Sequence, residues 1–142
     1  DLNLLQPEQA LAFYREALRI VEREHARDQN DARARRDVDR LLRKTALMIV
    51  DRQPAEAMAL VQRALQLSGI HLRTSPNNTE YIRDSADGLL LYAYGLQNLN
   101  RHREAIQYLE KGLEKQLALQ RSSPEAKRFQ RELQETYEAI GD

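Results

Sequence analysis

The repeating unit of the chain is clearest in the stretch PAEAMALVQRAL at residues 54–65. Two other stretches align with it, PEQALAFYREAL at residues 7–18 and HREAIQYLEKGL at residues 102–113, so the copies begin 47 and then 48 residues apart. Apolar positions three, four and seven residues apart lie on one face of a helix. Each copy is therefore predicted to be an amphipathic helix with its aligned residues in the core: Ala10, Ala57 and Ala105; Tyr14, Val61 and Leu109; Ala17-Leu18, Ala64-Leu65 and Gly112-Leu113.

A second set of columns, spaced by 48 residues, lies between these stretches: Leu41, Leu89 and Tyr137; Thr45, Ala93 and Gly141; Met48 and Leu96. These columns predict a second helix in each repeat. Pro7 and Pro54 stand where the first turn of a helix tolerates proline. The patterns together predict an all-α chain of about six helices, at residues 8–27, 31–51, 54–73, 78–99, 101–121 and 125–140.

The connections between the helices also repeat. Asp28, Ser75 and Ser123 share one column, and all three are residue types favoured at helix N-caps. Pro76 and Pro124 follow the two serines, where proline suits the first position of a helix. We therefore expect three equivalent helix starts at these residues.

The amino-acid composition limits the kinds of molecule that the chain is expected to bind. The chain has 142 residues, which is enough for one domain, and its 22 basic residues balance its 22 acidic residues. Without a net charge, neither nucleic acid nor an anionic membrane surface is a favoured partner. No apolar run approaches the roughly 20 residues of a membrane span, and there is no cysteine. The compartment stays open.

The aligned large and small residues resemble the tetratricopeptide repeat (TPR) pattern. Tyr137, Ile140 and Gly141 match its first-helix signature, and its second-helix signature is matched by Ala105, Leu109, Gly112 and Leu113. The usual TPR period is about 34 residues, and two extra turns in each helix account for the longer period here. The pattern is similar to the long repeats of kinesin light chains. It is also similar to regions that follow bacterial serine/threonine kinase domains, on the residues Arg35-Arg36-Asp37 and Ile140-Gly141-Asp142.

The resemblance implies a right-handed solenoid of antiparallel helix pairs spanning residues 1–142, as a fragment of a longer chain. HEAT repeats and a four-helix bundle are the alternatives. A bundle would not explain the internal period. By analogy with TPR grooves, the expected partner-binding residues on the concave surface are Asp39, Leu42, Ala46, Ile49, Val50, Asp87, Leu90, Tyr94, Gln97 and Asn98. Tyr94 fits either a binding anchor or a local plug.

One column of this predicted groove is acidic. Asp39, Asp87 and Glu135 align, and such a column would favour a ligand with Lys or Arg at matching spacing. Arginines stand four residues before each of these carboxylates, so local pairing along the helix is the alternative. These arginines are Arg35, Arg83 and Arg131.

No pattern of an enzyme, a cofactor site or a metal site is found. His25, His71 and His102 lack a second ligand three or four residues away, and the five glycines form no phosphate-binding loop. Gly88 and Gly95 lie inside a predicted helix, where close helix packing is the favoured explanation. Gly69 is expected to leave its helix continuous or kinked. The predicted function is binding of a protein or peptide partner without a cofactor, and self-association into a homo-oligomer is the alternative.

Overall fold

The computed structural model describes residues 2–122 and 127–141, which form six α-helices and no strand. The helices are α1 (Leu2–Arg27), α2 (Ala32–Ile49), α3 (Pro54–Thr74), α4 (Thr79–Asn98), α5 (His102–Ser122) and α6 (Lys127–Gly141). The all-α prediction is confirmed. Most predicted helix limits agree within two residues, but α1 starts earlier than predicted. It contains Pro7 in its interior rather than in its first turn.

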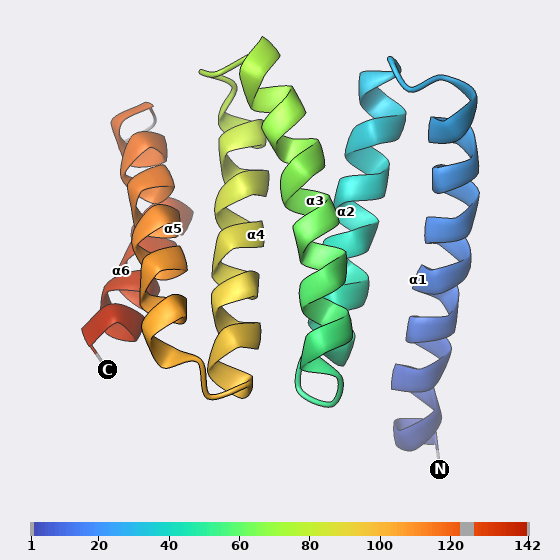
Figure 1. The fold of residues 1–142 in the computed structure, drawn as a ribbon, viewed down its shortest axis with the longest axis horizontal. Helices are drawn as coiled ribbons and strands as arrows, with labels where there is room; N and C mark the ends of the chain where they lie inside the picture. The colour runs from blue at the N-terminus through green and yellow to red at the C-terminus, as the bar shows by residue number, and fades with distance from the viewer. Residues whose placement is uncertain (1, 123–126, 142) are drawn as a thin grey trace.

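The helices stand in a row, from α1 at one end to α5 and α6 at the other (Figure 1). Each helix packs against the next one along the chain, and α2 also contacts α4. α1 also reaches α3, through the ion pairs Arg15–Glu56 and Glu22–Arg63. A row of this kind agrees with a helical repeat and has no single central core of the sort that defines a four-helix bundle.

The helix starts differ from the predicted ones. Asp31 and Asn78 are the N-caps of α2 and α4, and each side chain accepts hydrogen bonds from two backbone N–H groups of the first turn. The predicted caps Asp28 and Ser75 lie three residues too early: Asp28 accepts from Asn30 within the loop, and Ser75 ends α3. Asp31 and Asn78 are themselves 47 residues apart, so the caps still repeat. Ser123 and Pro124 lie outside the described residues.

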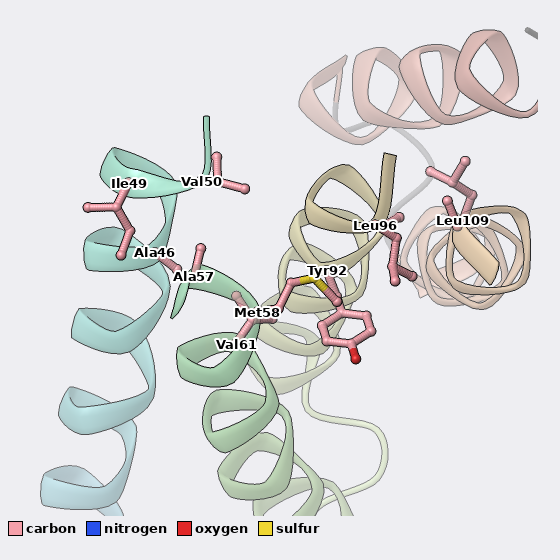
Figure 2. Close-up of a cluster of buried hydrophobic side chains, with 11 residues drawn as sticks. Ala46, Ile49, Val50, Ala57, Met58, Val61, Tyr92, Leu96 and Leu109 are labelled. Atoms are coloured by element: carbon pink, nitrogen blue, oxygen red, sulfur yellow. The ribbon is translucent and has the colours of Figure 1, made fainter. Parts of the chain in front are cut away.

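The largest buried cluster joins α2, α3, α4 and α5 near the ends of α2 and α4 (Figure 2). The second column set is confirmed in α2 and α4, where Thr45, Ala93 and Leu96 are buried. It is wrong in α6, where Tyr137 is 54% exposed and Gly141 is exposed too. The column of Ala57 and Ala105 is buried as well. A smaller cluster of α1, α2 and α3 contains Leu18, Val38, Leu42 and Ala64. The repeating columns are therefore packing positions in α2 to α5, but not in α6.

Two glycines of α4 lie at close helix contacts, as expected. A Cβ atom on Gly95 would stand 2.7 Å from Cγ of Met58, and one on Gly88 would stand 2.8 Å from Cδ2 of Leu65. Both contacts are with α3, so the missing side chains let α3 and α4 approach each other. α3 continues through Gly69, as predicted.

Candidate partner-binding groove

A groove of about 700 Å³ runs between α2 and α4. These two helices belong to successive repeats and run in the same direction (Figure 1). Most of the lining is charged, and the apolar residues are leucines. The lining consists of Arg36, Arg40, Arg43, Lys44 and Leu47 from α2, and Thr79, Glu80, Arg83, Asp84, Asp87, Leu90 and Leu91 from α4.

Arg43 is the centre of the charged part of the groove. Its guanidinium lies 2.9 Å from Oδ1 of Asp39, 3.1 Å from Oδ1 of Asp84 and 3.6 Å from Oδ2 of Asp87. Asp39 precedes Arg43 by one helical turn on α2, whereas the other two carboxylates come from α4. One arginine therefore ties α2 to two carboxylates of α4, while it also pairs with Asp39 on its own helix.

Arg36 makes the second link between the helices. Its Nε donates to Oδ2 of Asp84 at 2.9 Å, and its Nη1 lies 2.9 Å from Oε2 of Glu80. A matching link joins the next repeat, where Nη1 of Arg83 on α4 donates to Oε1 of Glu132 on α6 at 2.6 Å. Glu132 stands 48 residues after Asp84, so this inter-repeat ion pair follows the period of the sequence.

Burial raises the pKa values of two carboxylates near Arg43. Asp39 is fully buried, and this burial raises its pKa to about 6, although Arg43 opposes the shift. The pKa of Asp87 is raised too, by the loss of surrounding water and by Glu132. Because 47% of the Asp87 side chain is exposed, solvent screens its charge more than that of Asp39. The Asp84 hydrogen bond raises the pKa of Arg36.

The other part of the groove is apolar. Leu47 is 64% exposed, and Leu90 and Leu91 are partly buried beside it. Leu90 also packs on Gly112 of α5, where an added Cβ would stand 2.8 Å from the leucine Cδ2. A ligand lying along the groove would thus meet charged side chains first and leucines one to two turns further on.

Tyr94 stands near the ends of α2 and α4, outside the lining of the groove. Its ring is 43% exposed, and its hydroxyl donates to Oδ1 of Asp51 at 2.8 Å. Asn98 donates from Nδ2 to the carbonyl of Val50 at 3.2 Å and to Oδ1 of Asp51 at 3.3 Å. These two residues hold the α2–α3 loop against α4, while Gln97 is half-buried nearby.

The structure places several predicted groove residues in the core instead. Leu42, Ala46, Ile49 and Val50 are at most 4% exposed, and Asp39 lies beneath Arg43. Their face of α2 packs inward, with Leu42 in the same cluster as Leu18 of α1 and Ala64 of α3. The face of α2 that lines the groove is offset by one residue from the predicted face, which is a rotation of about 100° around the helix. Of the predicted residues, Asp87 and Leu90 do line the groove.

The prediction of an acidic groove is wrong, because the charged residues that line the groove are mostly basic. The lining has five basic side chains (Arg36, Arg40, Arg43, Lys44, Arg83) and three acidic ones (Glu80, Asp84, Asp87). The alternative pairing is wrong for Asp39, whose ion pair is with Arg43 and not with Arg35. Asp87 lies 3.6 Å from Arg43, and Arg83 also acts on its charge. Glu135 is exposed on α6.

Sequence reasoning missed the basic face of α2. The signal was present, because Arg36, Arg40, Arg43 and Leu47 follow the spacing of one helix face. The TPR analogy selected the neighbouring face, which is apolar in α2 and looked like a binding surface. Burial by α1 and α3 explains that apolar character.

Comparison of the chain with protein-family models gives no match, and comparison with curated protein sequences gives none either. In the parts of the chain that the structure describes, no helix combines the length and apolar character needed to cross a membrane. No three His, Asp or Glu side chains within those parts come together as a set that could hold a metal ion.

Proposed function

We propose that this chain is a protein-interaction module that binds a segment of another protein in the groove between α2 and α4. The observation that carries the proposal is the groove itself, about 700 Å³ in volume and lined by two helices one repeat apart. The exposed Leu47 supplies an apolar contact of the kind that anchors peptides in helical grooves. We also propose that the helices pair as in TPR proteins and form a right-handed solenoid, in which α2 and α4 line the concave surface.

The row of helices and the repeated ion pairs between repeats support this architecture. Arg36–Asp84 and Arg83–Glu132 join α2 to α4 and α4 to α6, so corresponding helices of successive repeats stand next to each other. In a stack of such helix pairs the first helices form a continuous surface. The groove follows from that arrangement.

Selection of peptides from a random display library against the immobilised chain tests this function. We expect the selected peptides to lose about tenfold or more in affinity when Leu47 is changed to Ser. The control is Ile106→Ser, which alters an exposed apolar side chain on α5, 43% exposed and away from the groove. The proposal is wrong if no peptide is enriched, or if both variants bind the selected peptides as the wild type does.

Self-association is the second candidate function, because α1 carries its own exposed apolar residues. Phe13 is 69% exposed and Ile20 46%, and their spacing of seven residues puts both on one helix face. Light scattering at several protein concentrations should then show a dimer that Phe13→Ser combined with Ile20→Ser converts to a monomer. A wild-type chain that stays monomeric at every concentration rules this candidate out.

A further inference from the structure

The carboxylates of the groove already have cationic partners inside it. Glu80 lies 2.9 Å from Arg36, Asp84 contacts both Arg36 and Arg43, and Asp87 faces Arg43 at 3.6 Å. A basic ligand would have to compete with these internal guanidinium groups. The acidic wall on α4 is therefore poorly placed to attract a ligand of positive charge.

Two cations on the α2 side of the groove, Arg40 and Lys44, are not neutralised in the same way. We call this side the α2 rim. Arg40 is exposed, and among the residues that the structure describes it has no carboxylate partner. Lys44 is exposed as well, with its ammonium 5.8 Å from the centre of the Tyr14 ring. A ring contact leaves the charge of the lysine unneutralised. The charge that remains for a ligand is positive and lies on the α2 side.

The apolar contacts lie further along the same face. Leu47 follows Arg40 by seven residues, two helical turns or about 10 Å. Leu91, across the groove on α4, is partly buried. A ligand that used both parts would need acidic and apolar side chains separated by about that distance.

We propose that the groove binds an acidic amphipathic peptide segment whose carboxylates face Arg40 and Lys44 on α2 and whose apolar side chains cover Leu47 and Leu91. The inference rests on the proposed function and adds the chemistry and the orientation of the ligand. Because the free cations stand on one rim only, the acidic edge of the ligand faces α2. Charge complementarity at a rim acts mainly on association rate and on discrimination between ligands.

Three short synthetic peptides test the chemistry. They share two leucines and differ in their charged residues, which are Glu in the first, Lys in the second and Gln in the third. We expect the Glu peptide to bind about tenfold more tightly than the Lys peptide, measured by fluorescence anisotropy at low salt. Raising the salt from about 50 to about 300 mM should reduce this difference, because screening weakens exposed charge pairs.

Variants locate the contact. The double variant Arg40→Gln and Lys44→Gln should weaken the Glu peptide about tenfold and leave the Gln peptide unchanged. The control, Arg103→Gln with Lys111→Gln, removes the same charge from α5, outside the groove. A Lys peptide that binds as tightly as the Glu peptide, or equal effects of the two double variants, would overturn the acidic chemistry.

The same assay separates this inference from the function on which it rests. If Leu47→Ser weakens all three peptides while their charge makes no difference, the groove binds peptides and only the acidic chemistry is wrong. If none of the three binds at any salt concentration, both proposals fail. If the Glu peptide binds best and depends on both Leu47 and the α2 cations, both hold.

Discussion

The two ends of the α2–α4 pair are built from different interactions. Along the groove the helices meet through Arg36, Arg43 and the carboxylates of α4, and the space above these ion pairs is open. We call this part of the pair, which reaches from Arg36 to Leu47 on α2, the open end. Near the C-terminal ends of the helices, Ala46, Ala93 and Leu96 are buried in the apolar cluster with α3 and α5 that Figure 2 shows, and we call this part the closed end. The same two helices are thus joined by ion pairs under an open groove, and by buried apolar side chains at the closed end.

This difference indicates that the closed end stabilises the fold and that the open end is available to bind a partner. Burial of one large apolar side chain contributes about 1.5–3 kcal/mol. The net gain from an ion pair is small, because the cost of removing both charges from water offsets their attraction. The closed end therefore supplies most of the free energy that holds α2 near α4. The open end can carry charged residues for a partner at its rim, because little stability depends on exposed side chains such as Arg40 and Lys44.

The largest expected effect comes from the closed end. Leu96, 1% exposed, should cost about 3 kcal/mol of unfolding free energy when changed to Ala, because its removal leaves a cavity among α3, α4 and α5. Leu47→Ala, at the open end and 64% exposed, should cost less than about 0.5 kcal/mol. Urea denaturation followed by circular dichroism measures both. Equal losses would show that stability is not concentrated at the closed end.

A glycine pair measures how tightly the closed end is packed. Gly95→Ala should destabilise the chain by about 1 kcal/mol, because the new methyl group would stand 2.7 Å from Cγ of Met58 and overpacking outweighs the gain in helix propensity. Gly69→Ala is the matched control inside α3. Its methyl group would meet nothing nearer than 4.0 Å, so it should stabilise by up to about 1 kcal/mol.

Thermal melts of the two glycine variants should therefore shift in opposite directions. A rise in melting temperature for Gly95→Ala would mean that Met58 moves aside without cost, and that the contact between α3 and α4 is looser than the structure indicates.

The fold was largely predictable because its packing positions repeat. The columns of Ala57 and Ala105, and of Thr45 and Ala93, mark residues that are small because a neighbouring helix crosses there. Such a constraint acts on every repeat and leaves a periodic pattern in the sequence. The loops do not carry this constraint, and the N-caps were predicted three residues too early for that reason.

The groove was less predictable because burial depends on neighbours that differ from repeat to repeat. Leu42 and Leu90 occupy the same column, yet Leu42 is fully buried with Leu18 of α1, and Leu90 keeps part of its surface in the groove. Ion pairs between helices are equally hard to predict from the sequence of one helix. The partner of Asp87, for example, is Arg43 of another repeat. Sequence spacing alone identifies neither.

The smallest effect concerns the buried carboxylate at the open end. Asp39 is enclosed with Arg43, Arg36 and Asp84, and its burial raises its pKa to about 6 from an ordinary value of 3.8. The folded chain then holds this proton more tightly than the unfolded chain does. The contribution of Asp39 to stability therefore increases as the pH falls through about 6 and is lost as the pH rises through it.

Comparison of the wild type with Asp39→Asn isolates this contribution from that of every other acidic group, including Asp87. Between about pH 7.5 and about pH 5, the unfolding free energy of the wild type should rise relative to that of the variant by about 1 kcal/mol. Urea denaturation at several pH values measures the difference. Asn cannot ionise, and Arg43 also pairs with Asp84 at 3.1 Å, so the charged end should stay assembled in the variant. A difference that stays constant over this range would mean that Asp39 keeps an ordinary pKa, and that water reaches the carboxylate beneath Arg43. A difference that changes in the opposite direction would mean that the ion pair with Arg43 outweighs the cost of burial. The open end would then contribute to stability at neutral pH. That result would contradict the conclusion that the closed end supplies most of the stability.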